Sequence, residues 1–310
     1  MDRPRVSIGV PVFNGERFLE ETILSLLRQT YTDFEIIISD NASTDRTGEL
    51  ARDLAAHDER VQYARNPRNL GAAYNYRRAF NLSAGEYFKW AAADDLCQPE
   101  YLARCVEVLD SDSSAVLAHT RTLFIDEEGR PLDIADPGWD LRSPDAGERL
   151  RYVIGAGHWV NIIFGVIRRA ALARTRFLGS YPKGDYRLLG DLAVLGKFIE
   201  LPERAFLRRL HGEASSAHAD DVAWHVAFYT GAAQGWSLPL WFRMLDHCRT
   251  IAGAPLSTGV KLSVLCSLVR HTVASRRELV EELRVASRHA VRRIRPVTRR
   301  TRHPQTARPR

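Results

Sequence analysis

Cysteine is scarce in this sequence, and no two cysteines stand at a spacing typical of a metal site. The chain has four cysteines in 310 residues and no Cys-x-x-Cys motif. This pattern excludes a zinc ribbon and gives no sign of a disulfide framework. We therefore expect free thiols in a reducing cytoplasm, at Cys97, Cys105, Cys248 and Cys266.

Long apolar runs are also missing. A membrane-spanning helix needs about 18 or more apolar residues in succession, and the nearest candidate, residues 262–269, is short and flanked by Lys261 and Arg270. The first five residues lead into a strand pattern without an apolar leader, so we expect no signal peptide. With 45% hydrophobic and 26% charged residues, the composition is that of one large or two smaller globular domains.

Acidic residues are absent from the C-terminal end. Residues 284–310 contain ten arginines and no Asp or Glu. Without these arginines, 34 basic residues remain against 38 acidic ones, a net charge of −4 instead of the formal +6 of the whole chain. The basic charge is thus a property of a tail and gives no evidence for a nucleic-acid-binding core.

Strand and helix patterns alternate over the first hundred residues. Apolar β-type runs cover residues 6–10, 35–39, 61–64 and 87–93, and helical patterns, such as 72–82, separate them. In the second half a further strand is predicted at residues 161–167. This order predicts an α/β fold with a mostly parallel sheet and helices on both faces. In such sheets ligands bind beyond the carboxyl ends of the strands.

Three polar clusters follow the predicted strands at those ends: Asn14 with Glu16, Asp40 with Asn41, and Asp94 with Asp95. Adjacent carboxylates repel each other unless water or a positive charge lies beside them. The last pair alone is compatible with a solvated acidic turn or with a divalent cation held by oxygen ligands. Three clusters at one edge of a sheet favour a binding site.

Four motifs occur in order: VSIGVPVFNGE from residue 6, SDNASTD from residue 39, NLG at 69–71 and ADD at 93–95. Together they resemble the family 2 glycosyltransferases over roughly residues 5–215. This resemblance implies the GT-A fold, in which a Rossmann-like nucleotide-binding half is joined to an acceptor-binding half. It also implies an inverting enzyme that uses a nucleotide sugar.

The resemblance assigns roles by position. Asp40 would hydrogen-bond the base, usually uracil or thymine, and Asp94 and Asp95 would end the Asp-x-Asp motif that holds Mg²⁺ or Mn²⁺ against the diphosphate. The family's first Asp of that motif falls on Ala92, so we expect weakened nucleotide contacts or an altered donor. The remaining nucleotide contacts would come from Pro11, Val12, Asn14, Glu16, Asn69 and Gly71, together with Asp94.

Residues 183–196 resemble the family segment in which an acidic residue opens a helix that ends in glycine. Counted back from Gly196, Asp185 falls at the position of the family's catalytic base. A helix N-terminus favours the anionic form of a carboxylate, which a base needs. Asp185 could instead only cap the helix. Asp191 competes for the role, but it lies six residues on and points in a different direction on a 3.6-residue period, so we expect it to be structural or to contact the acceptor.

The segment that contains Arg209 and His211 resembles the Arg-x-His segment that closes the catalytic domain. There both side chains would reach the diphosphate or the metal, with His211 as a third ligand, although a single histidine is more often structural. We place the catalytic domain at residues 1–218, with nucleotide-binding and acceptor-binding halves at 5–120 and 121–218.

Beyond residue 220 the resemblance stops. We expect a helical region at 219–294 and a basic, disordered tail at 295–310. Leu279, Leu283, Ala286, Ala290 and Ile294 mark an apolar stripe on a basic helix. This region either packs on the core or binds anionic lipid on the inner face of the membrane.

The sequence therefore predicts a metal-dependent hexosyl- or deoxyhexosyltransferase of cell-envelope polysaccharide or glycolipid synthesis. Its donor would be a UDP or dTDP sugar and its acceptor a saccharide or glycolipid, with no nucleic-acid partner. Two alternatives stay open. A nucleotidyltransferase shares the sheet architecture, but its Gly-rich, Arg-containing loop is missing from residues 11–15. A non-catalytic nucleotide-binding or scaffold protein of the same fold would be compatible with Ala92.

Overall fold

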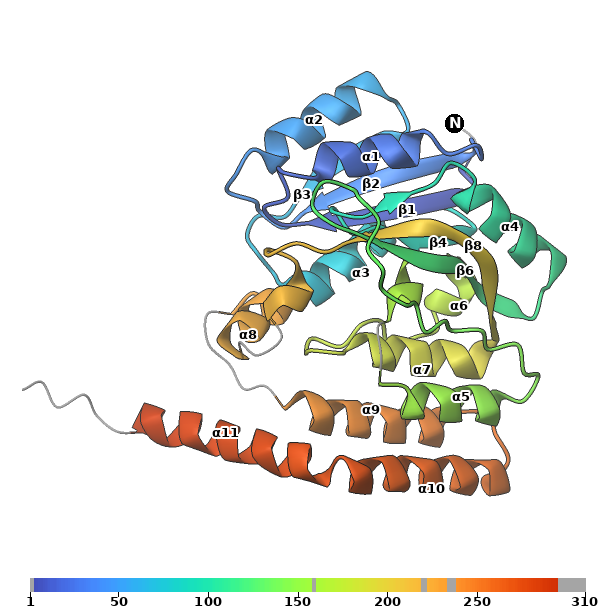
Figure 1. Cartoon of the computed structure of the whole chain (residues 1–310), viewed down its shortest axis with the longest axis vertical. Helices are drawn as coiled ribbons and strands as arrows, with labels where there is room; N and C mark the ends of the chain where they lie inside the picture. Colours follow the sequence, from blue (N-terminus) through green and yellow to red (C-terminus); the bar gives the residue numbers. More distant parts are fainter. Residues whose placement is uncertain (1–2, 158–159, 219–221, 233–237, 295–310) are drawn as a thin grey trace, which may run out of the picture.

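An eight-stranded mixed sheet forms the centre of the molecule (Figure 1). The computed structural model describes residues 3–157, 160–218, 222–232 and 238–294. The strand order across the sheet is β3-β2-β1-β4-β7-β6-β8-β5. The strands are β1 (Val6–Val12), β2 (Phe34–Asp40), β3 (Val61–Arg65), β4 (Tyr87–Trp90), β5 (Leu96–Cys97), β6 (Ala115–Ile125), β7 (Val166–Arg168) and β8 (Lys197–Arg209).

The first four strands are parallel, as the alternation of strand and helix patterns predicts. Every residue of β1, β2 and β4 is buried, because helices cover both faces of this part of the sheet. In Figure 1 the helices α1 and α2 lie on one side of these strands and α3 on the other. The helices are α1 (Leu19–Leu27), α2 (Thr47–His57), α3 (Ala72–Leu82) and, farther along the sheet, α4 (Tyr101–Ser111).

The second half of the sheet is mixed. β7 runs antiparallel to both β4 and β6, β8 runs parallel to β6, and the short β5 pairs antiparallel with β8. The sheet is therefore continuous from one predicted half of the catalytic domain to the other, and the boundary at residues 120 and 121 falls within β6. Its helices are α5 (Ala146–Gly155), α6 (Arg169–Leu172) and α7 (Asp185–Leu195).

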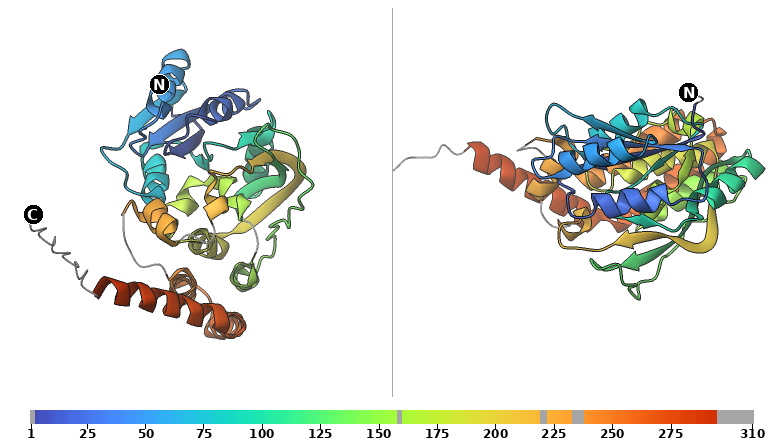
Figure 2. Two further views of the ribbon diagram at one scale, coloured as in Figure 1. Left: turned by 60° about the vertical axis from the view of Figure 1, so that its left-hand side comes forward. Right: turned by 90° about the horizontal axis from the view of Figure 1, so that it is seen from above.

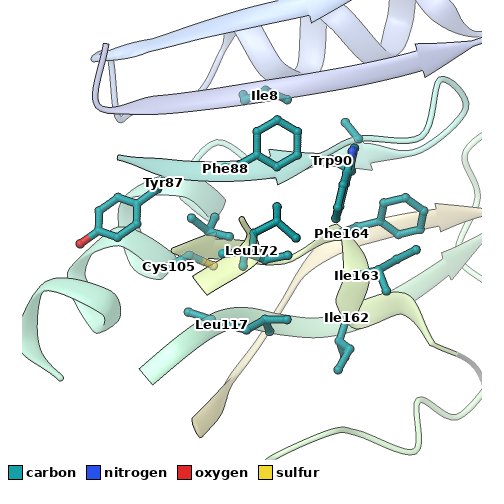
Figure 3. Close-up of a cluster of buried hydrophobic side chains, with 14 of the residues drawn as sticks. Ile8, Tyr87, Phe88, Trp90, Cys105, Leu117, Ile162, Ile163, Phe164 and Leu172 are labelled. Atoms are coloured by element: carbon teal, nitrogen blue, oxygen red, sulfur yellow. The ribbon is translucent and has the colours of Figure 1, made fainter. Parts of the chain in front are cut away.

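One hydrophobic core joins the two halves (Figure 3). Phe88 and Trp90 on β4 pack edge to face with their ring centroids 5.0 Å apart, an arrangement that aromatic pairs prefer. Ile8 on β1 lies on one side of this pair, and Phe164, from the second half, lies on the other. All four side chains are buried.

The strand predicted at residues 161–167 is wrong over its first five residues. Asn161–Phe164 form a 3₁₀ turn, η1, and the strand β7 begins only at Val166. Asn161 Nδ2 donates to Thr122 Oγ1 over 3.0 Å and holds the turn against β6. Gly165 permits the close approach, since a Cβ there would lie 2.8 Å from the carbonyl oxygen of Ala118.

The helical C-terminal region predicted from the sequence is confirmed. A 3₁₀ turn, η2 (Ser215–His218), precedes it, and it contains the helices α8 (Val222–Thr230), α9 (Pro239–Gly253), α10 (Thr258–Ala274) and α11 (Arg276–Ile294). α9 packs on α7, and α10 packs on α5 and α9. Figure 1 shows α10 and α11 one after the other along one edge, and Figure 2 shows that they meet at an angle, with the end of α11 projecting beyond the body. Within the described ranges, no helix is both long and apolar enough to cross a membrane. The predicted tail at 295–310 lies outside the described residues.

Candidate active site

The loops that follow β1 and β2 are joined by hydrogen bonds at the carboxyl edge of the sheet. Thr44 N–H donates to Asn14 Oδ1 over 2.8 Å, and Arg46 N–H donates to Glu16 Oε2 over 2.8 Å. Asn14 adopts a left-handed backbone, with φ 52°, and its own N–H donates to Ser43 Oγ. This rim holds four of the predicted nucleotide contacts: Pro11, Val12, Asn14 and Glu16.

Asp40 ends β2 directly opposite Val12 and is fully buried. Its Oδ1 accepts from Ser43 N–H over 2.8 Å, so Asp40 itself caps the turn. Its Oδ2 accepts from Tyr63 Oη over 2.8 Å and from Arg65 Nη1 over 2.7 Å. Burial and the bond to Asp40 raise the pKa of Tyr63. A base that binds Asp40 through Oδ2 would compete with Arg65, whose side chain is 44% exposed and also donates to the Ser43 carbonyl oxygen over 2.8 Å.

Asn69 and Gly71 lie in a tight turn beside this edge. Asn41 Nδ2 donates to Asn69 Oδ1 over 2.8 Å, and the N–H of Leu70 donates back to Asn41 Oδ1. Gly71 has φ 83°, which favours glycine. A Cβ at Gly71 would also lie 2.5 Å from the carbonyl oxygen of Tyr229 on α8. The turn thus joins the nucleotide-binding rim to the C-terminal helices.

The acidic pair lies in the turn between β4 and β5, where Arg209 holds it. Arg209 N–H donates to Asp95 Oδ1 over 2.9 Å, and Arg209 Nε donates to the carbonyl oxygen of Asp94 over 3.0 Å. The rest of the guanidinium donates to the Glu127 carbonyl oxygen and to Glu21 Oε2. Its side chain is 1% exposed. Arg209 therefore fixes the acidic turn in place, and its guanidinium donates to Glu21 and to the carbonyl oxygens of Asp94 and Glu127.

His211 lies beside the same turn, with its Nε2 2.8 Å from Asp94 Oδ2. Within the described part of the chain its buried Nδ1 has no hydrogen-bond partner. Asp95 is buried, and desolvation together with the charge of Asp94 raises the pKa of the Asp95 carboxyl to about 7. Ala92 is half-buried against the core and offers only its carbonyl oxygen, which faces the N–H of Asp95.

The predicted metal ligands Asp94, Asp95 and His211 lie close together. Among the described residues, however, no group of three acidic, cysteine or histidine side chains has the arrangement of a complete metal site. Two carboxylates and an imidazole nevertheless form a donor set that suits Mn²⁺ or Mg²⁺. The residues present fit a divalent cation.

Asp185 is the first residue of α7, as expected, and the helix ends before Gly196. Its Oδ1 accepts from the N–H of Tyr186 over 2.9 Å. Burial raises the pKa of Asp185 to about 6, against the smaller opposing effects of that bond and of the Arg208 charge. Asp191 instead accepts from Arg176 Nη2 over 2.7 Å and from Thr250 Oγ1 on α9. Asp191 is thus part of the interface between α7 and α9.

Arg208 is a residue that the sequence analysis missed. It lies on β8 next to Arg209, and its Nη1 donates to Asn161 Oδ1. Its charge lowers the pKa of both Asp95 and Asp185, so it lies within electrostatic reach of the two carboxylates. Because side chains alternate along a strand, the Arg-Arg pair itself indicated that one arginine would face away from the other.

Comparison with known proteins agrees with this geometry. The model of the family described as glycosyl transferase family 2 matches residues 7–174. An uncharacterized glycosyltransferase of Methanocaldococcus jannaschii is 32% identical over 134 residues, which cover 43% of this chain and 46% of the relative. Chondroitin synthase of Escherichia coli is 28% identical over 222 residues, which cover 71% of this chain and 31% of that protein. The chain therefore belongs to the family 2 glycosyltransferases.

Solved structures confirm the fold. Residues 1–349 of TarS from S. aureus, in complex with UDP-GlcNAc, align with a TM-score of 0.68 at 14% identity over 87% of this chain and 73% of that one. The mannosyltransferase PcManGT from Pyrobaculum calidifontis, in complex with GDP-Man and Mn²⁺, aligns with a TM-score of 0.53 at 18% identity over 93% and 81% of the two chains. The predicted GT-A fold is therefore correct. This chain spans less than half the length of several of the curated relatives it matches.

Proposed function

We propose that this chain transfers a sugar, a hexose or deoxyhexose, from a nucleotide-sugar donor to an acceptor hydroxyl with inversion at the anomeric carbon. One observation carries the proposal. Asp185 opens α7 as a half-buried carboxylate, and Asp94 and Asp95 form an acidic turn beside His211 that Arg209 on β8 holds in place. Because the chain belongs to the family 2 glycosyltransferases, we assign sugar transfer to this arrangement.

Asp185 acts as the general base. Its carboxylate accepts the proton of the acceptor hydroxyl as the oxygen attacks the anomeric carbon from the side opposite the leaving group. A pKa of about 6 suits the task, because the group is ionised at neutral pH and still basic enough to take a proton. The N–H of Tyr186 orients the carboxylate through Oδ1.

The rim of β1 and β2 binds the nucleotide. Asp40 would accept from the imino N–H of uracil or thymine after Arg65 moves out, and the turn at Asn69 and Gly71 would border the donor. Asp94, Asp95 and His211 would hold Mg²⁺ or Mn²⁺, which supplies positive charge against the departing diphosphate. Of the similar structures, TarS holds UDP-GlcNAc and PcManGT holds GDP-Man with Mn²⁺.

We further propose that residues 5–120 bind the donor and residues 121–218 the acceptor, within a catalytic domain of residues 1–218. The acceptor would be a saccharide or glycolipid of the cell envelope. A saccharide acceptor agrees with the name of one relative, chondroitin synthase, because chondroitin is a polysaccharide. The enzyme would work in the cytoplasm, on the inner face of the membrane.

The test is a thermal-shift panel of UDP, dTDP, GDP and CDP with Mn²⁺ or Mg²⁺, followed by donor hydrolysis with several sugars. We expect a metal-dependent rise in Tm with a uracil or thymine nucleotide and slow hydrolysis of the matching sugar. No response to any nucleotide would refute the proposal and favour a non-catalytic protein of this fold.

A further inference from the structure

The outer face of α10 and α11 exposes large apolar side chains. Leu262, Val269 and Val273 on α10 are 57%, 53% and 55% exposed. The same face continues with smaller exposed fractions at Leu265, Val280 and Leu283. Single exposed apolar residues are ordinary on a protein surface, whereas a contiguous apolar patch marks an interaction site.

These residues form one stripe because of their spacing. Successive members lie three or four residues apart within each helix, which places them on one side of a 3.6-residue helix. The inward side of α10 is separate, since Val264 and Leu268 are buried in the cluster shared with α5 and α9. In the same way Leu279 on α11 is buried, and Trp241 Nε1 on α9 donates to its carbonyl oxygen.

The two helices follow one another along one edge of the molecule (Figure 1) and meet at an angle (Figure 2), so the stripe continues from one helix to the next. Within α10 the part from Leu262 to Val273 extends for about 16 Å at 1.5 Å per residue. Figure 2 shows the end of α11 standing clear of the rest of the molecule. The stripe therefore belongs to a protruding edge that a flat surface can reach.

The charge along this edge is mostly positive. The sequence contains no Asp or Glu from residue 247 to residue 277, and none after Glu282. Exposed arginines lie on the stripe or beside it at Arg270, Arg276, Arg277 and Arg284. Only Glu278 and Glu281 offset them among the exposed residues of this edge, and Arg284 pairs with Glu281 at 3.5 Å.

We propose that the outer face of α10 and α11 lies on a lipid surface that carries anionic headgroups. An apolar stripe flanked by arginines is the pattern of a helix that lies in the membrane interface, where side chains such as Leu262 enter the acyl region and the arginines meet phosphate groups. A second copy of the chain fits this face less well, because pairing it with itself would bring positive edges together.

The side toward which α11 projects also carries α8, whose Tyr229 carbonyl oxygen meets the Gly71 turn. The inference differs from a purely electrostatic attachment through a basic tail, because it assigns the apolar contact to particular residues.

The experiment compares vesicle cosedimentation of the full chain with that of the triple variant Leu262→Ser, Val269→Ser and Val273→Ser. The vesicles contain phosphatidylcholine alone or phosphatidylcholine with 30 mol% phosphatidylglycerol, roughly an anionic leaflet. A matched control, Leu24→Ser with Leu82→Ser, removes side chains that are 40% and 43% exposed on α1 and α3. Circular dichroism confirms that each variant is folded.

We expect the native chain and the control to bind the anionic vesicles equally and the neutral vesicles weakly. The triple variant should bind the anionic vesicles at least about tenfold more weakly, because three apolar side chains no longer enter the bilayer. Unchanged binding by the triple variant would refute the inference and assign attachment to the tail. A lipid-free dimer, seen by light scattering and abolished by the triple variant, would also overturn it, because the face would then pair copies of the chain.

Discussion

Replacing Asp185 by Asn tests the base and its environment together. The change keeps the size of the side chain and the acceptor oxygen for the N–H of Tyr186, but it removes the group that takes the proton. We expect turnover to fall by about 10²- to 10⁴-fold, the usual contribution of a general base, while the affinity for the donor stays the same. Loss of donor binding in this variant would argue against the base role.

The same substitution should make the folded chain more stable at neutral pH. The folded pKa of Asp185, about 6, lies above the ordinary value of 3.8, so between these pH values the folded chain binds more protons than the unfolded chain. The stability that this group contributes is present below about pH 4 and is lost as the pH rises through 6. At 1.36 kcal/mol per pKa unit the loss is at most about 3 kcal/mol. Water reaches the half-buried side chain, so we expect about 1 to 2 kcal/mol.

The assay is urea unfolding of the native chain and of Asp185→Asn between pH 4.5 and 8. We expect the difference in the free energy of unfolding to be small at pH 4.5, to grow through pH 6 and then to level off. The matched control on the same helix is Asp191→Asn, which should lose about 2 kcal/mol because its bonds to Arg176 and Thr250 are broken. A pH-independent difference for Asp185→Asn would refute our account of its burial.

Three further substitutions test the rest of the site. In Asp95→Asn, added Mn²⁺ should no longer increase donor binding, measured by isothermal calorimetry, or transfer, measured by donor hydrolysis. If transfer in this variant still depends on the metal, Asp95 is not a ligand. Gly71→Ala should lower the free energy of unfolding, measured in urea, by about 2 kcal/mol and increase hydrogen exchange in α8. Gly129→Ala is the control, because Gly129 has φ 82° and a Cβ there would meet open space, so that this variant shows the effect of backbone strain alone. Arg209→Lys should lower the free energy of unfolding by about 2 kcal/mol or more, because an ammonium cannot reach all four groups to which the guanidinium donates; an unchanged free energy of unfolding would show that the acidic turn does not depend on the guanidinium.

The first four strands and the helices between them were predictable because their signals are local. Apolar runs mark the buried strands β1 and β2, and the helix predicted at 72–82 coincides with α3. Asp185 was placed correctly at the start of α7 from the position of Gly196. In each case the residues that determine the element lie within the element or next to it.

The sequence could not predict contacts between distant parts of the chain. Two examples depend on how the sheet is assembled: the ion pair between Arg65 and Asp40, and the hydrogen bond from Arg209 to the acidic turn. The strand predicted at 161–167 failed for a similar reason, because Asn161 turns toward Thr122 on another strand. Arg208 acts electrostatically on Asp185 and Asp95, which lie 23 and 113 residues away in the sequence. No local sequence pattern predicts an effect over such a separation.

The continuity of the sheet from β4 to β7 has a consequence for synthesis on the ribosome. β1 to β4 pair with one another as soon as the first 90 residues have emerged, but the free edge of β4 pairs only with β7, which ends at Arg168. At about 5 to 20 residues per second, the intervening chain takes roughly 4 to 16 seconds to be made. During that time the growing chain carries an open, apolar strand edge that invites aggregation. Slow translation between residues 91 and 168 should therefore lower the yield of folded protein more than slow translation of the C-terminal helices.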